Sequence, residues 1–206
     1  MYLPKHFAET DVGVIHDLMR DFPLATLVSH GPDGLSANHI PLQLDATAGP
    51  NGTLRGHIAR ANPLGRSAPV DAEILVIFQG PESYISPTNY ATKAEHGKVV
   101  PTWNYTAVHA YGRLRLIDDP AWIFAQISAL TATHESRLPQ PWAVSDAPAD
   151  YIEKMLGAIV GIEITIERLI GKWKVSQNQP AVNQASLIAA LEGQPMAELI
   201  RGRVAK

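Results

Sequence analysis

One short segment combines residue types that could hold a phosphate group. Arg60 follows a predicted strand over residues 53–59, and Asn62 with Pro63 comes directly after it. Because proline is favoured at the first position of a helix, we expect Arg60 to stand just before a helix N-terminus. A guanidinium can bind two phosphate oxygens, and the free N–H groups of a helix start also attract an anion. The segment predicts a phosphate site, although a surface arginine at a strand end would have the same spacing.

Two further segments combine small hydroxyl groups, an amide and aromatic rings. They are residues 83–87, with the sequence SYISP, and residues 100–105, with the sequence VPTWNY. A flat heteroaromatic ligand needs this mixture, because rings and apolar groups cover its faces while amides and hydroxyls bond its edge. The alternative is that Trp103 and Tyr105 pack in a core with their polar tips satisfied.

A third segment, residues 173–180, comes at the end of the last predicted strand and has the sequence WKVSQNQP. Its lysine, serine and amide side chains could contact phosphate or hydroxyl oxygens of a ligand. Serine and asparagine also bond their own backbone in turns, so a capped strand end is the alternative.

The eight histidines do not form a metal-binding motif. His30, His39, His57 and His109 lie on predicted strands, without the paired spacings H-x-H or H-E-x-x-H. We therefore expect no metal site, whereas a haem held by a single axial histidine would leave no motif and stays open. No nucleophile elbow for serine-based catalysis is present either.

The composition limits the classes of protein to which the chain could belong. The 206 residues are 46% hydrophobic, which is enough for a packed core, and the formal net charge is -3. A negative chain has no overall positive field to attract nucleic acid or anionic lipid. The lack of cysteine excludes disulfides and thiolate sites, and no segment is typical of a signal peptide or a membrane span. We expect a cytoplasmic protein.

The hydrophobic pattern predicts short strands mixed with helices. Gly31 to Gly34 is a strong turn signal between two strands, and Asp118, Asp119 and Pro120 form a helix start. Residues 80–101 carry many polar groups and read as a long functional loop. We expect strands over residues 24–30, 35–44, 53–59, 74–79, 103–117 and 161–170, the last continuing over 172–176, and helices over 10–22, 122–138, 149–156 and, in two parts, 183–204.

Strands in hairpin order, with helices between and after them, favour an antiparallel barrel over a parallel sheet. The fold class is therefore mainly β with helices (α+β). The chain also lacks the glycine-rich motifs of nucleotide-binding parallel sheets. We predict one domain over residues 1–206, with residues 183–206 as a helical C-terminal extension.

Several blocks together resemble the FMN-binding negative transcriptional regulator family, also called the PaiB family. The resemblance covers residues 1 to about 180 and implies a split β-barrel similar to pyridoxamine phosphate oxidases. It also implies a homodimer with FMN in clefts at the subunit interface. The blocks that carry it are MYLPKHF at 1–7, NHIPL at 38–42, GHIARANP at 56–63, FQGP at 78–81, YISP at 84–87, VPTWNY at 100–105 and SQN at 176–178.

The resemblance also assigns candidate cofactor-binding residues. Its motifs imply that Arg60 and Asn62 lie at the phosphate end of FMN, and that His39, His57 and Ser86 belong to neighbouring strand or loop motifs. Thr102, Trp103 and Asn104 would approach the ring system, and Ser176, Gln177 and Asn178 would close the cleft. Two positions depart from the family pattern: Asn89 stands where tryptophan is expected, and Gln179 stands where arginine is expected.

Three functions are compatible with these residues. The first is a flavin-dependent transcriptional regulator or sensor, although no helix-turn-helix pattern is present and the C-terminal Arg201, Arg203 and Lys206 are few for a DNA surface. The second is an FMN-dependent oxidoreductase that uses a nicotinamide or another small-molecule ligand, since the cofactor itself would carry the redox step. The third and weaker one is a haem-binding protein.

Overall fold

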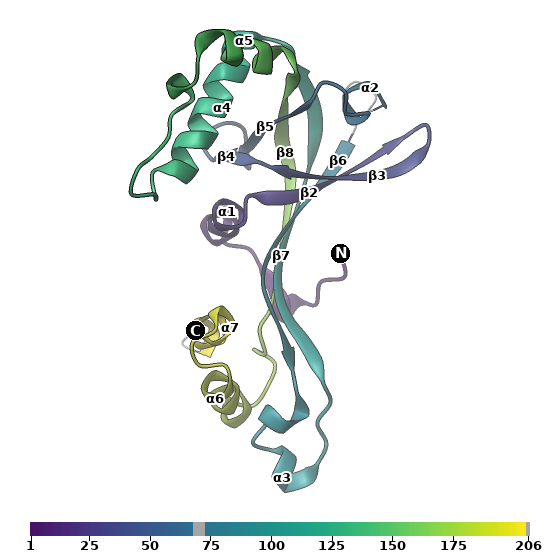
Figure 1. The fold of residues 1–206 in the computed structure, drawn as a ribbon. Coiled ribbons are helices and arrows are strands. Elements are labelled where there is room, and N and C mark those ends of the chain that lie inside the picture. The colour runs from purple at the N-terminus through teal and green to yellow at the C-terminus, as the bar shows by residue number, and fades with distance from the viewer. Residues whose placement is uncertain (68–72, 205–206) are drawn as a thin grey trace. The chain divides into compact units, whose positions relative to one another are not determined.

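The computed structural model describes residues 1–67 and 73–204 (Figure 1). Its strands are β1 (Ala8–Glu9), β2 (Leu24–Gly31), β3 (Gly34–Pro41), β4 (Gln43–Asp45), β5 (Thr53–Ala59), β6 (Glu73–Ile85), β7 (Thr102–Ile117) and β8 (Ile159–Lys174). Its α-helices are α1 (Val12–Asp21), α2 (Leu64–Ser67), α3 (Lys93–His96), α4 (Pro120–Glu135), α5 (Ala149–Gly157), α6 (Ala181–Ala190) and α7 (Pro195–Val204). Short 3-10 turns cover Lys5–Phe7, Pro87–Asn89 and Val144–Asp146. Within the described part of the chain, no helix is both long and apolar enough to cross a membrane.

The strands form one eight-stranded sheet in the order β3-β2-β6-β7-β8-β5-β4, with β1 added against β8. The pairs of β2 with β3 and with β6, of β5 with β4 and with β8, and of β1 with β8 are antiparallel. The predicted hairpin is confirmed, because Gly31 and Gly34 are paired across its turn and Gly34 has a φ of 97°. The antiparallel α+β prediction is therefore confirmed.

Two predicted boundaries are wrong. The strand predicted over residues 35–44 ends at Pro41, and Leu42 donates its backbone N–H to the carbonyl of Pro23 before β4 begins. The predicted loop over residues 80–101 begins only after Ile85, because β6 runs straight through Gly80 and Pro81. A Cβ at Gly80 would lie 2.3 Å from the hydroxyl oxygen of Thr106, so this glycine allows a close approach inside the sheet.

The contacts divide the described chain into two compact units. Unit 1 comprises Met1–Asp21, Gln79–His109 and Ile170–Lys206, and unit 2 comprises Phe22–Phe78 and Ala110–Leu169. Each of the long strands β6, β7 and β8 contributes residues to both units. Whether the chain acts as the single domain expected from its sequence stays a prediction.

The core of unit 2 is built by alternating strand residues. Ile162, Ile164 and Ile166 of β8 are fully buried, while Thr165 between them and Glu167 after them are exposed and Glu163 is half-buried. This alternation is the predicted pattern of a half-exposed antiparallel strand. Each buried isoleucine contributes about 1.5–3 kcal/mol relative to an exposed one. Unit 2 also holds α4, whose predicted start is confirmed because Asp119 accepts hydrogen bonds from the first N–H groups of the helix.

The core of unit 1 contains the two C-terminal helices. They are separated at Gly193, which has a φ of 79°, as the sequence predicts. Helices α6 and α7 pack against the end of β6 and the residue after β8, so the C-terminal segment is part of the unit 1 core. The buried members of this cluster are Ile85, Tyr90, Val175, Leu187, Leu191, Met196, Ala197 and Ile200.

Candidate functional site

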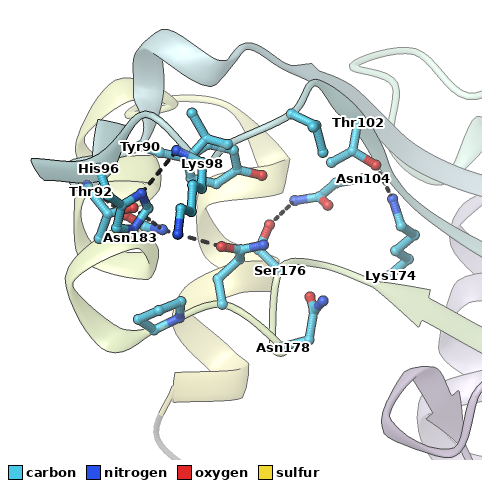
Figure 2. A pocket seen from close by; sticks show the side chains of 14 residues that line it. Tyr90, Thr92, His96, Lys98, Thr102, Asn104, Lys174, Ser176, Asn178 and Asn183 are labelled. Atoms are coloured by element: carbon cyan, nitrogen blue, oxygen red, sulfur yellow. Dashed lines mark hydrogen bonds between the residues drawn. The ribbon is translucent and has the colours of Figure 1, made fainter. Parts of the chain in front are cut away.

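Unit 1 contains a polar cavity of about 330 Å³, which we call the Lys174 cavity (Figure 2). Its walls come from the segment between β6 and β7, the start of β7, the end of β8 and the start of α6. These segments are far apart in the sequence and meet only in the folded unit. The lining residues are Tyr90, Thr92, His96, Lys98, Val99, Val100, Thr102, Asn104, Lys174, Ser176, Asn178, Gln179, Pro180 and Asn183.

The cavity carries positive charge without a matching carboxylate. Lys98 and Lys174 line it, and none of the described lining residues is an aspartate or a glutamate. The ammonium of Lys174 donates a hydrogen bond to the hydroxyl of Thr102 (Figure 2). It donates another to the carbonyl of Trp103, and both acceptors are neutral. Burial lowers the pKa of Lys174, and the nearby Lys172 lowers it further. An anion in the cavity would relieve both effects.

Lys172 places a second cation on the same face of β8, because residues two apart in a strand share a face. Its side chain is buried and donates a 3.1 Å hydrogen bond to the carbonyl of Tyr2. The ammonium also lies 5.1 Å from the centre of the Tyr105 ring and 5.9 Å from that of Tyr2. Among the described residues, neither Lys172 nor Lys174 is paired with a carboxylate.

A buried polar contact forms one wall of the cavity. The side-chain nitrogen of Asn104 donates a 2.8 Å hydrogen bond to the hydroxyl of Ser176 (Figure 2). Ser176 has a φ of 62°, a left-handed conformation that costs a non-glycine residue on the order of 1–3 kcal/mol. Its carbonyl accepts hydrogen bonds from the backbone of Gln179 and the side chain of Gln184, which hold the turn in place. Such strain is concentrated at functional sites.

A second polar network closes the cavity on the side of α6. Asn183 accepts a 3.1 Å hydrogen bond from the backbone N–H of Thr92 and donates to the hydroxyl of the same residue at 3.0 Å. It also donates to the side chain of Gln179 at 3.2 Å. Gln179, which replaces the arginine expected from the family pattern, is therefore part of this network. Burial raises the pKa of the neighbouring Tyr90 hydroxyl.

The cavity brings together only some of the site residues predicted in unit 1. Thr102, Asn104, Ser176 and Asn178 line it. Lys174 also lines it, as the lysine of segment 173–180 that was expected to contact a ligand, whereas sequence reasoning missed Tyr90, Thr92, His96, Lys98 and Asn183 as site residues. Four of them, Tyr90, Thr92, His96 and Lys98, lie in the polar segment over residues 80–101. The sequence already predicts that this segment is functional, so it could have indicated them.

Three other predicted residues of unit 1 are not among the lining residues. Trp103 is 53% exposed and meets the ring of Tyr84 edge-on, with 5.7 Å between the ring centres. The alternative in which Trp103 packs in a core is therefore wrong. Gln177 accepts a hydrogen bond from the backbone of Val175, and Ser86 accepts one from the backbone of Thr88.

In unit 2, the guanidinium of Arg60 is hydrogen-bonded to groups of the same chain. It donates hydrogen bonds of 2.9 and 2.7 Å to the two carboxylate oxygens of Asp118. Further bonds of 2.9 and 3.0 Å run to the carbonyls of Gly157 and Ile159. The paired charges raise the pKa of Arg60 and lower that of Asp118, mainly through their hydrogen bonds. Both side chains are exposed, and such exposed ion pairs are weak enough to exchange for another anion.

Asn62 organises the turn after Arg60. Its side-chain oxygen accepts a 2.9 Å hydrogen bond from the backbone N–H of Leu64, where α2 begins. Its nitrogen donates to the side chain of Asn38, also at 2.9 Å. The predicted helical stretch after Pro63 is confirmed, although it is only four residues long.

The two predicted histidines of unit 2 differ in environment. His39 is exposed on β3. The Nδ1 atom of His57 lies 2.9 Å from the side-chain oxygen of Gln126, whose nitrogen is buried and has no hydrogen-bond partner among the described residues. Across residues 1–67 and 73–204, no group of three or more metal-ligating side chains could hold a metal ion.

Known proteins resemble this chain along most of its length. A family model with the description "Putative FMN-binding domain" matches residues 1–168. An uncharacterised protein of Emericella nidulans is 36% identical over 98% of this chain and 97% of its own length. Protease synthase and sporulation protein PAI 2 of Bacillus subtilis, also known as PaiB, is 28% identical over 100% of this chain and 99% of its own length.

Solved structures share the fold at low sequence identity. The FAD and heme binding protein of Mycobacterium smegmatis has a TM-score of 0.61 at 16% identity, covering 81% of this chain and 73% of that one. A flavocytochrome of Azotobacter vinelandii has a TM-score of 0.56 at 15% identity, covering 84% and 72%. The predicted split-barrel fold is confirmed.

Proposed function

Because the chain belongs to the FMN-binding domain family, we propose that it is a regulator or sensor whose state depends on bound FMN. The family match over residues 1–168 supports FMN as the cofactor. The regulatory role is supported by the Bacillus subtilis relative, which is named for protease synthase and sporulation and aligns over the whole chain. We also propose a cytoplasmic homodimer in which a second copy completes the flavin site.

The donor groups of the chain fit FMN. The observation that carries this assignment is the start of β7, where Trp103 presents an exposed ring on one face of the strand and Asn104 a buried amide on the other. A flavin ring needs an aromatic or apolar face and a few polar partners at its edge. Bound FMN would supply electron-transfer chemistry, while the side chains of this protein bind and orient it.

The remaining proposed contacts are with the phosphate group of FMN and with its ring. We assign the phosphate to Arg60 and Asn62, since the exposed Asp118 carboxylate can give up the Arg60 guanidinium to a stronger anion. Thr102 would accompany Trp103 and Asn104 at the ring. The other assignments follow the family motifs and concern His39, His57, Ser86, Ser176, Gln177 and Asn178.

Direct DNA binding through the C-terminal helix has little support. Arg201 is paired with Glu198 and Glu192, and Arg203 is paired with Glu9. Lys206 lies outside the described residues. Because the described arginines of α7 are already neutralised, we propose that the regulatory output runs through a protein surface that responds to the flavin.

A second candidate is an FMN-dependent oxidoreductase. The Lys174 cavity favours it, because a reduced nicotinamide carries phosphates that the lysines could bind. In this alternative bound FMN would supply hydride- and electron-transfer chemistry, while Lys98 and Lys174 would hold the phosphates of the nicotinamide.

One spectroscopic experiment separates these functions. The purified protein is mixed with FMN, freed of excess by gel filtration, and its visible spectrum is recorded before and after NADPH is added without oxygen. Retained flavin bands that persist with NADPH support the regulator, and bands that bleach faster than free FMN support the oxidoreductase. Loss of all flavin bands contradicts both, and a Soret band after addition of haem would support the third alternative.

A further inference from the structure

We propose that the Lys174 cavity binds a small organic anion, through a phosphate or carboxylate group, as a second ligand besides FMN. The site goes beyond the proposed flavin-dependent role, but it rests on that role in part, because its lining residues Thr102, Asn104, Ser176 and Asn178 are also proposed for FMN and the anion would bind next to the flavin. The ligand would be the signal in a regulator or the acceptor in an oxidoreductase.

The lining of the cavity has an excess of positive charge. Lys98 and Lys174 bring two ammonium groups to its lining, and no described lining residue brings a carboxylate. Lys174 bonds only to a hydroxyl and a carbonyl, and the buried Lys172 beside it likewise has no acidic partner among the described residues. Lys98 is exposed and Lys174 is half-buried, so the partly desolvated ammonium of Lys174 is the charge that an anion from outside the chain would neutralise.

The size and lining of the cavity suit a small polar ligand. Its volume of about 330 Å³ lies at the lower end of the range of roughly 300–1,000 Å³ found for small-molecule sites. Hydroxyls of Thr92 and Thr102 and the amide of Asn178 can bond a polar ligand, while Val99 and Pro180 offer apolar contact. A compact anion fits this space better than a large planar ring does.

Hydrogen bonds within the chain hold the lining of the cavity in place. The bond from Asn104 to Ser176 fixes one wall, and the bonds of Asn183 to Thr92 and Gln179 fix another. Polar groups held in this way need little reordering when a ligand binds, which favours affinity for a small molecule.

The test titrates the FMN-loaded protein with inorganic phosphate, and separately with succinate, by calorimetry at constant ionic strength set with chloride. We expect saturable binding of at least one of them without release of flavin, and the stronger of the two identifies the preferred anionic group. Lys98→Met and Lys174→Met should each weaken binding about tenfold, as expected for loss of one charge-assisted contact. Lys93→Met, an exposed lysine outside the cavity, is the matched control.

The proposal is overturned if neither anion gives heat above that of chloride, or if Lys93→Met weakens binding as much as Lys98→Met does. Competitive displacement of FMN by phosphate overturns the proposal when Lys174→Met abolishes the competition, because the cavity would then be the phosphate seat of the flavin itself, whereas competition at Arg60 would persist in that variant. If the protein retains no FMN, the same titration is made on the flavin-free protein, so failure of flavin binding and failure of the anion site remain distinguishable.

Discussion

The side-chain nitrogen of Asn104 lies 2.8 Å from the hydroxyl oxygen of Ser176, and both residues are buried. This bond joins β7 to the turn after β8, two segments that are 72 residues apart in the chain. It therefore fixes the wall of the Lys174 cavity at the residue with the left-handed backbone.

The first prediction removes this bond. Asn104→Ala leaves the buried hydroxyl of Ser176 without its donor, and we expect the free energy of unfolding to fall by about 1–3 kcal/mol. Urea denaturation measures the change. Asn178→Ala, an exposed residue on the same cavity, should change stability by less than about 0.5 kcal/mol. Equal losses in the two variants would contradict the structural role of the bond.

The second prediction concerns the exposed ring of Trp103. Trp103→Ala should weaken FMN binding by about two- to tenfold, the range expected for loss of one aromatic contact. The dissociation constant is measured by the quenching of FMN fluorescence. Trp142→Ala is the control, because Trp142 is also largely exposed but belongs to unit 2 and to none of the FMN motifs. An unchanged dissociation constant in Trp103→Ala would remove this residue from the flavin site.

The third prediction uses the ion pair of Arg60 with Asp118. Asp118→Asn takes away the competing carboxylate, so a phosphate at Arg60 should bind more tightly. We expect the dissociation constant of FMN to fall by about two- to fivefold, the effect typical of a single exposed charge. Riboflavin, which has no phosphate, serves as the control ligand and should show no gain. Weaker FMN binding in Asp118→Asn would mean that the pair positions the site instead of blocking it.

The fourth prediction concerns pH and the contact of Glu9 with Arg203. Burial alone would raise the pKa of Glu9, but the hydrogen bond from the N–H of Asp11 and the ion pair with Arg203 outweigh it, and the net shift is downward. A carboxyl whose pKa is lower in the folded state stabilises the protein above its unfolded pKa. That stabilisation is lost as the pH falls from the ordinary glutamate range through the lowered value.

Glu9→Gln tests this dependence. The variant should lose about 1–3 kcal/mol of unfolding free energy at pH 7, as expected for a hydrogen bond to a charged group, and should lose less on further acidification than the parent protein. Urea denaturation at pH 7 and at lower pH gives both values. Glu95→Gln, an exposed glutamate of α3, is the control. Parallel pH profiles for the parent and Glu9→Gln would contradict the assignment.

Much of the fold follows from local patterns in the sequence. Ile162, Ile164 and Ile166 alternate with polar residues, so their burial in β8 could be predicted from the period of a strand. The break between the C-terminal helices at Gly193 follows from local turn chemistry in the same way. The path of β6 through Gly80 could not be predicted, because the reason for that glycine is the hydroxyl of Thr106 on another strand.

The candidate site is less predictable because its contacts are long-range. The forked donors of Arg60 are evident in the sequence, but their partner Asp118 is 58 residues away. The network of Thr92 and Asn183 joins positions 91 residues apart, and no local spacing reveals it. Family motifs identified Asn104 and Ser176 as site residues, and the local sequence indicated Lys174 as a possible ligand contact. The role of Lys98 could not be predicted, because it depends on the folded cavity, whose described lining residues include no carboxylate.

The two lysines of β8 also have a consequence for handling the protein. A folded unit with two ammonium groups side by side, and no described carboxylate to offset them, is sensitive to the counterions that its buffer supplies. Phosphate buffer can provide a partner that Tris-chloride of equal ionic strength provides less well, and binding to the folded state alone raises thermal stability. If the proposed anion site is present, we expect the melting temperature to be higher in phosphate than in Tris-chloride of equal ionic strength.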